Sequence, residues 1–211
     1  MRRLVLLLPL VALIGCGGGP KVTQMREVGA YTDLAVSSDL DVDVVPGDSG
    51  HVVVTGGKDV IDRVRTTVRD GVLHISIKDH GIVIGPDPFD GVRVQVPVGA
   101  LDTIGISGTS DIDLGRIERD TLTLDVQGTS DITAAGTVDS LTVNIEGTGD
   151  AHLAELQART ASVNLAGAGD AEVSVSDALD VQIQGAGDVV YHGTPSIRQR
   201  VEGAGEVRQD D

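Results

Sequence analysis

One four-residue pattern recurs six times in the second half of the chain: glycine, then threonine or alanine, then serine or glycine, then an acidic residue. Its copies begin at Gly108, Gly128, Gly147, Gly167, Gly185 and Gly203. The steps between successive first glycines are 20, 19, 20, 18 and 18 residues. A nearly constant step of this length is typical of a solenoid, in which each repeat is one turn of the same structure.

The segment before each turn alternates apolar and polar residues, as in Leu141-Thr142-Val143-Asn144-Ile145. A second, shorter alternation follows the turn, for example at Ala171, Val173 and Val175. A period of two predicts strands with one buried face, so each repeat contains two strands joined by a sharp bend. Such a unit cannot bury that face alone, but stacked copies can. We therefore expect an all-β parallel β-helix or solenoid. An antiparallel meander is the alternative, although it would not require the same turn at a fixed step.

Residues 29–100 have a different pattern, and we expect them to form a β-rich cap on the repeats or their irregular early turns. Strands are expected at 40–44, 51–54 and 91–98, with a helical turn at 59–64. The pair Asp70-Gly71 predicts a hairpin between 65–69 and 72–77, because a type I′ turn needs positive φ at both central residues. The expected segments are a leader (1–15), a tether (16–28), the cap (29–100) and the repeats (101–211).

The N-terminus has the features of an export signal. A positively charged start, Met1-Arg2-Arg3, precedes an apolar run that is too short to span a bilayer as a helix. The run ends in Leu13-Ile14-Gly15-Cys16, which resembles the lipobox of bacterial lipoproteins, and Cys16 is the only cysteine. We expect cleavage before Cys16 and lipidation of its thiol, which would anchor the protein in the cell envelope. Position 17 is not aspartate, so the resemblance implies the outer membrane in a cell with two membranes.

Composition excludes several classes of function. Hydrophobic residues make up 40% of the chain, enough for a core, but Phe89, Tyr31 and Tyr191 are its only aromatic residues. Small aliphatic side chains must therefore fill a thin interior. The formal net charge of −16 disfavours binding to nucleic acid or to an anionic membrane surface. No cofactor is expected.

The acidic residues of the turns would form a column in a solenoid: Asp111, Asp131, Asp150, Asp170 and Asp188. Adjacent strands lie about 4.8 Å apart, so stacked carboxylates repel one another unless cations or amide groups compensate. Calcium is one candidate, because it takes oxygen ligands from carboxylates and turn carbonyls. The interpretation that we favour is structural: each aspartate accepts hydrogen bonds from the amides of its own turn, and each glycine supplies the conformation of a tight corner.

The sequence predicts no catalytic residues. Its five histidines are scattered, without a pair at metal-ligand spacing. The alternative is a polysaccharide-active enzyme on the same scaffold, which would need an acidic cluster beside a basic residue; Arg116, Arg119 and Arg159 are the candidates. The outward positions of the longer strands form a polar column: Asp125, Asn144, Asn164 and Gln182. Such a column keeps a solenoid soluble or serves as an adhesive surface.

Together these segments resemble a known family, the auto-transporter adhesin head domains called GIN domains, found in bacterial envelope proteins and lipoproteins. The resemblance is carried by the stretches 40–48, 70–75 and 94–97 and by the repeated turns as far as Pro195. It implies a right-handed β-helix at the cell envelope, with no catalytic residues. The expected function is that of a lipid-anchored, adhesin-like protein that contacts an envelope or extracellular protein or polysaccharide; self-association is compatible with it.

Overall fold

The computed structural model describes residues 21–37, 39–48, 50–78, 89, 91–98 and 101–210. Cys16 lies outside these residues. The elements in chain order are β1 (Lys21–Glu27), β2 (Asp33–Ser37), β3 (Asp41–Pro46), β4 (His51–Gly57), α1 (Lys58–Ile61), β5 (Val64–Arg69), β6 (Val72–Ile77), β7 (Arg93–Val98), β8 (Thr103–Gly147), β9 (Ala151–Gly167), β10 (Ala171–Gly185), β11 (Val189–His192), β12 (Ser196–Gly203) and β13 (Val207–Gln209). Within the described ranges, no helix is long and apolar enough to cross a membrane.

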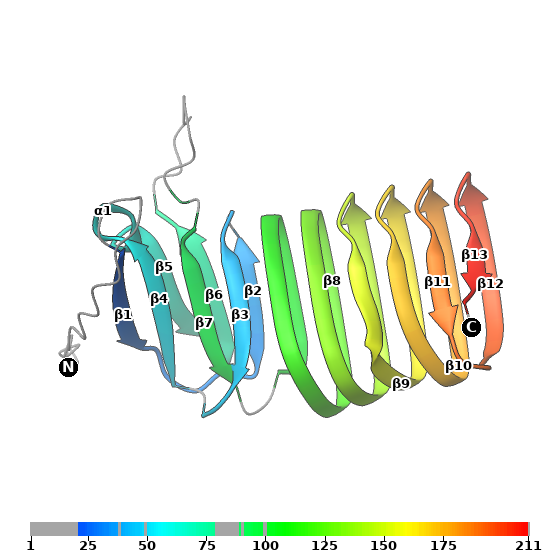
Figure 1. The fold of residues 1–211 in the computed structure, drawn as a ribbon, viewed down its shortest axis with the longest axis horizontal. Coiled ribbons are helices and arrows are strands. Elements are labelled where there is room, and N and C mark those ends of the chain that lie inside the picture. Colours follow the sequence, from blue (N-terminus) through cyan, green and yellow to red (C-terminus); the bar gives the residue numbers. More distant parts are fainter. Residues whose placement is uncertain are drawn as a thin grey trace.

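Strands β8, β9 and β10 wind around one axis, so that each repeat stacks on the one before it (Figure 1). The pairing is parallel and in register: Val143 lies beside Val163, and Val163 lies beside Val181. All three side chains are completely buried. The expected all-β solenoid is confirmed. The antiparallel meander is wrong for the repeats, because β11, β12 and β13 also pair in parallel with their neighbours.

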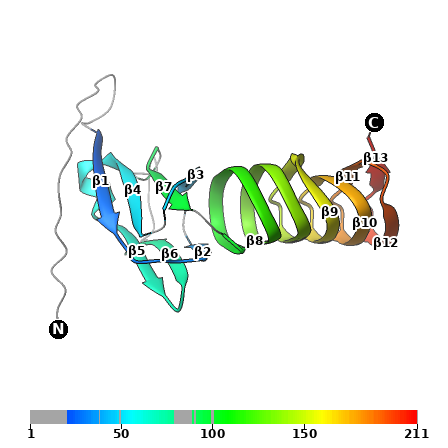
Figure 2. The same cartoon turned by 90° about the horizontal axis from the view of Figure 1, so that it is seen from below.

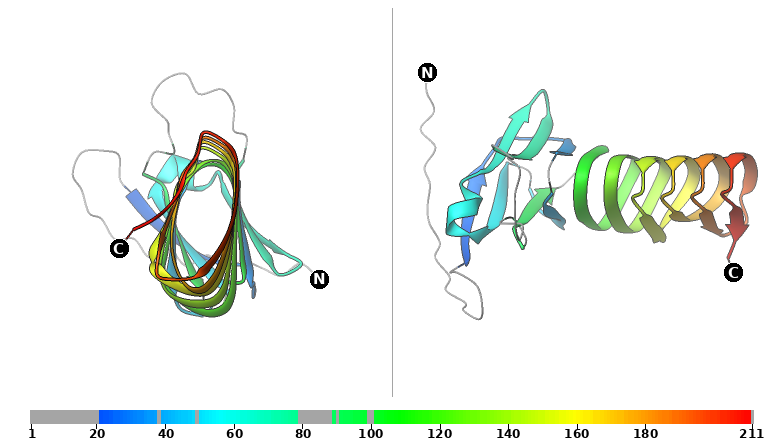
Figure 3. Two further views of the ribbon diagram at one scale, coloured as in Figure 1. Left: turned by 90° about the vertical axis from the view of Figure 1, so that its right-hand side faces the viewer. Right: turned by 90° about the horizontal axis from the view of Figure 1, so that it is seen from above.

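Along its axis the solenoid is a flattened ring with two long sides (Figure 3). The longer strand of each repeat forms one side, and the shorter strand after the glycine turn forms the other. Buried aliphatic residues such as Leu141, Leu153 and Val173 fill the space between the two sides. Each fully buried side chain of this kind contributes about 1.5–3 kcal/mol. The narrow ring explains how a chain so poor in aromatic residues can build a continuous core.

Two further coils precede the repeats, and their order along the axis is the reverse of their order in the sequence. Strand β2 stacks on the start of β8, with Val36 beside Ile106, and β3 stacks on the next part, with Val42 beside Ile112. The offset is 70 residues at both points, so β2 and β3 form one coil with the same register as the repeats. Strands β6 and β7 form the coil beyond it, paired in parallel with β2 and β3.

Antiparallel strands close this end of the solenoid (Figure 2). Strand β5 pairs with β6, β4 pairs with β7, and β1 forms the outer edge against β4. The predicted hairpin between β5 and β6 is confirmed, since Asp70 and Gly71 have φ angles of 52° and 82°. The expected helical turn forms slightly earlier, as α1 directly after β4.

The two aromatic residues of the N-terminal region that lie in described segments are both buried there. The Tyr31 hydroxyl donates a hydrogen bond of 2.7 Å to the carbonyl oxygen of Pro97, and burial raises the pKa of Tyr31 to about 12. The Arg63 guanidinium lies over the Phe89 ring, 4.7 Å from its centre. The first contact joins the two early coils, and the second joins the segment before β5 to the segment before β7.

Candidate functional site

The repeated glycines form one edge of the solenoid, where the longer strand of each coil ends (Figure 1). Each first glycine has a positive φ, for example 126° at Gly128 and 150° at Gly167. Its carbonyl accepts a main-chain hydrogen bond from the next coil, as in Ala168 N to Gly147 O at 2.9 Å. A Cβ built on Gly167 would lie 2.0 Å from that same oxygen. The glycines are therefore needed for close stacking of the corners.

The turn aspartates form a hydrogen-bonded ladder beside the glycines. The amide of Asp170 donates to an Asp150 carboxylate oxygen at 2.8 Å, and that of Asp188 donates to an Asp170 carboxylate oxygen at 2.7 Å. Glu206 continues the pattern against Asp188. The expectation that each aspartate caps its own turn is wrong for these three carboxylates, because each accepts an amide of the following coil. Among the described residues, no group of three or more metal-ligating side chains is present; calcium binding by the column remains an untested prediction.

We predict that Asp170→Ala lowers the free energy of unfolding by about 1–2 kcal/mol, because the amide of Asp188 loses its acceptor. Asp170→Asn is the matched control: it retains an acceptor oxygen and removes the charge, so stability should stay near that of the native protein. Denaturant unfolding with and without millimolar calcium measures both variants. A calcium-dependent stabilisation that disappears in Asp170→Asn would contradict the structural role and favour a cation site.

The longer side of the solenoid carries the predicted polar column. The Asn144 side-chain amide donates to Asp125 at 2.7 Å, and the Asn164 amide donates to the Asn144 oxygen at 2.8 Å. These side chains are partly buried and lock neighbouring coils in register. Gln182 continues the column in register beside Asn164 and is exposed. Much of the column's hydrogen-bonding capacity is therefore used within the protein.

A shallow hollow of about 540 Å³ lies on this same side, near the residues at which the longer strands begin. It crosses four coils, and its lining is rich in hydroxyl groups: Ser140, Thr142, Thr160, Ser162 and Ser196. Asp180 and Arg198, which form an ion pair of 3.4 Å, lie at its C-terminal end. We call this the hydroxyl-lined hollow. Sequence reasoning missed it, although the small polar residues at equivalent positions of successive repeats are its signal.

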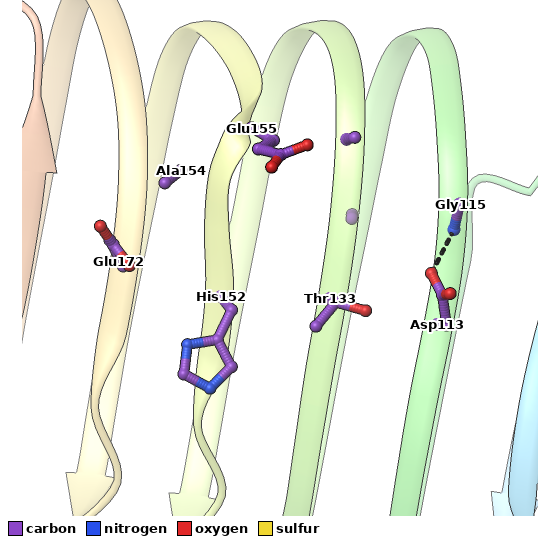
Figure 4. A pocket seen from close by; sticks show the side chains of 9 residues that line it. Asp113, Gly115, Thr133, His152, Ala154, Glu155 and Glu172 are labelled. Carbon is purple, nitrogen blue, oxygen red and sulfur yellow. Dashed lines mark hydrogen bonds between the residues drawn. The ribbon is translucent and has the colours of Figure 1, made fainter.

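A second hollow, of about 390 Å³, lies on the opposite side and has an acidic lining (Figure 4). Glu155 and His152 lie on one coil, Glu172 lies on the adjacent coil, and Asp113 lies further along. The hollow forms where β9 has extra residues at 154–156 that shift its register against both neighbours. A Glu172 carboxylate oxygen also lies 2.8 Å from His192 Nε2, within hydrogen-bond distance.

The three arginines named for an enzyme site do not join this acidic cluster. Neither hollow is lined by Arg116, Arg119 or Arg159. Arg159 lies instead between two carboxylates of the adjacent coils, 3.9 Å from Asp139 and 3.5 Å from Asp177. The acidic hollow therefore lacks the paired basic residue that the enzymatic alternative required.

Comparisons with known proteins agree with this architecture. The family model described as putative auto-transporter adhesin, head GIN domain, matches residues 30–195. No curated protein shows significant similarity to the chain. The crystal structure of a putative adhesin from Bacteroides fragilis NCTC 9343 has a TM-score of 0.73 at 18% identity, covering 90% of this chain and 97% of that one. That of a putative lipid binding protein from Parabacteroides distasonis ATCC 8503 has a TM-score of 0.53 at 20% identity, with the same coverage.

At these identities the two crystal structures establish a shared fold. The family match is more specific, because it covers most of the chain and includes both the early coils and five of the six glycine turns. The resemblance inferred from the sequence is thus confirmed, and the protein belongs to the auto-transporter adhesin head GIN domain family.

Proposed function

We propose that this protein is an exported, lipid-anchored, adhesin-like protein that binds a surface polysaccharide without catalysis. The observation that carries the proposal is the hydroxyl-lined hollow. Its serine and threonine side chains come from three of the four coils, and Asp180 lies beside Ser162 on the other coil, so a sugar polymer lying along the axis would meet polar groups at each step. Family membership supports an adhesin-like role, and the lipobox resemblance at Cys16 supports anchoring at the envelope.

Charge and composition favour a neutral polymer. The net charge of −16 repels polyanions. Hydroxyl groups can donate to and accept from sugar hydroxyls, and the Asp180–Arg198 pair adds a charged acceptor and donor at one end. The hollow has no aromatic platform among its lining residues. A single site would consequently be weak, and firm adhesion would depend on many anchored copies acting together.

The test uses cells that display the full chain and beads coated with dextran, mannan or heparin. We expect retention on one or both neutral polymers and none on heparin. Ser162→Lys places a long side chain in the middle of the hollow and should lower retention by about tenfold, because the loss is repeated at every copy. Ser174→Lys, on the opposite side, is the matched control and should bind normally. Absence of binding to any neutral polymer, or an equal loss in both variants, would contradict the proposal.

A further inference from the structure

The last described coil, β12 with β13, is open to solvent. Strand β12 pairs only with β10, and β13 pairs only with β11, so within the described residues no strand covers their outer edges. Ile197 and Val201 occupy the inward positions that Leu179 and Ile183 fill in the coil before. Their exposed fractions are 41% and 39%, against 1% for each of the earlier pair. The coil thus presents apolar side chains and unpaired main-chain groups together.

This end also differs in charge from the rest of the solenoid. Residues 101–195 contain sixteen acidic residues and only three arginines. Residues 196–210 contain three arginines, Arg198, Arg200 and Arg208, against three acidic residues. Two copies of the protein would repel each other along their sides but not at this end. A strongly anionic or strongly basic partner would gain no net electrostatic attraction at this end, because the end is neutral.

We propose that the C-terminal coil is a self-association surface at which two copies of this chain join end to end. Antiparallel pairing of β12 with β12 of the second copy, around a two-fold axis at Arg200, keeps the inward residues on the inner face. In that register Arg198 lies opposite Glu202 of the second copy, and the symmetric contact repeats the pair. The same register places Arg200 opposite Arg200 of the second copy, and each guanidinium keeps the contact with Glu202 of its own chain, which offsets the repulsion between them.

The pairing would satisfy the unpaired main-chain groups of the open end and cover its exposed apolar side chains. Main-chain groups on the outer edge of β12 gain partners, which removes the hazard of an unprotected strand edge. Ile197 and Val201 become covered by the second solenoid, and Gln199, which occupies the inward position between them, lies opposite Val201 of the second copy. The contact is isologous and therefore closes at two copies.

The joined pair has its two N-terminal regions at opposite ends, because β1 and β13 lie at opposite ends of each copy (Figure 1). If each copy is anchored near its N-terminus, the contact links two separate membrane surfaces. The self-association surface therefore adds a homophilic mode of adhesion to polysaccharide binding, and it uses the end of the solenoid rather than the centre of the hollow.

Sedimentation equilibrium of the full chain in a density-matched detergent tests the contact. We expect a reversible dimer. Arg198→Glu and Glu202→Arg should each weaken it by at least about tenfold, because each change places like charges opposite one another twice. The double variant Arg198→Glu/Glu202→Arg exchanges the two charges and should recover most of the affinity. Arg159→Glu is the matched control: it makes the same charge change at a side position and should leave the dimer intact.

Three outcomes would overturn the inference. The first is a native protein that does not dimerise at any concentration, whether it stays monomeric or pairs β12 with a strand of an unrelated protein. The second is a dimer that neither single reversal weakens. The third is a double variant with native circular dichroism that fails to recover dimerisation. Circular dichroism of the single variants separates a lost contact from a lost fold.

Discussion

Gly128→Ala should destabilise the protein by about 3 kcal/mol more than Gly50→Ala, although each variant adds a single methyl group to a glycine. The two glycines have almost the same φ angle, 126° and 127°. The strain of a side chain at positive φ, about 1–2 kcal/mol, therefore affects both variants alike. What differs is the space around the added methyl group.

A Cβ on Gly128 would lie 2.3 Å from the carbonyl oxygen of Gly108, whereas a Cβ on Gly50 meets no atom within 4 Å. The obstacle at Gly128 is main chain of the preceding coil, which cannot move without breaking the hydrogen bonds of that corner. The methyl group should force two coils apart, and the loss of stacking should spread to their buried side chains.

Chemical denaturation followed by far-ultraviolet circular dichroism measures this difference between the two variants. Equal losses of stability would show that only the backbone conformation matters at the corner, and that the close stacking of glycines contributes little. A loss in Gly128→Ala confined to the neighbouring coils, seen as faster amide exchange there, would agree with the prediction, since repeat proteins depend on nearest-neighbour contacts.

The repeats were predictable because the residues of each repeat indicate by themselves where its strands and its turn lie. Leu141, Val143 and Ile145 alternate with polar residues, and the glycine turn fixes where the strand ends, so period and register are both present in the sequence. The coil formed by residues 33–46 was not recognised as part of the same series. Leu40 lies where Ser110 lies in the first repeat, and no glycine precedes it at the corresponding spacing.

The order in which the early coils stack could not be predicted from their own residues either. Strand β2 lies between β6 and β8, which follow it in the chain by tens of residues. Such pairing depends on the whole set of buried faces. Apolar alternation identifies a strand but does not name its partner.

The candidate sites show a similar division. The carboxylate column was expected from the repeat, but its hydrogen bonds run to the next coil, which only the stacking geometry reveals. The bulge that shapes the acidic hollow has a signal in the spacing. The step from Gly147 to Gly167 is 20 residues and the following step is 18, and the extra residues 154–156 include the exposed Glu155. The spacing indicates an insertion, whereas its effect on the surface depends on which strand bulges.

Cys16→Ala should abolish acylation and release the protein from the membrane fraction. The apolar segment before Cys16 is too short to hold the chain across a bilayer as a helix, so anchoring depends on acyl chains, each buried CH₂ of which contributes about 0.8 kcal/mol. Incorporation of an alkyne-labelled fatty acid into the full chain measures the modification directly, and fractionation after a high-salt wash measures retention. Unchanged labelling in the variant would mean that a residue other than Cys16 is acylated. Absence of labelling in the native protein would contradict lipid anchoring.

Gly17→Asp is the matched control for this experiment, because it alters the residue after the acylated cysteine and leaves the thiol in place. Fatty-acid labelling and membrane retention should both persist. In a cell with two membranes, the variant should move from the outer to the inner membrane fraction, since aspartate at that position is the feature whose absence led us to expect the outer membrane. If the native protein and Gly17→Asp are both found in the inner membrane fraction while Cys16→Ala is released, the lipid anchor stands and the assignment to the outer membrane fails. The solenoid would then face a different compartment, and the polymers and partner copies within its reach would be those of the inner membrane surface.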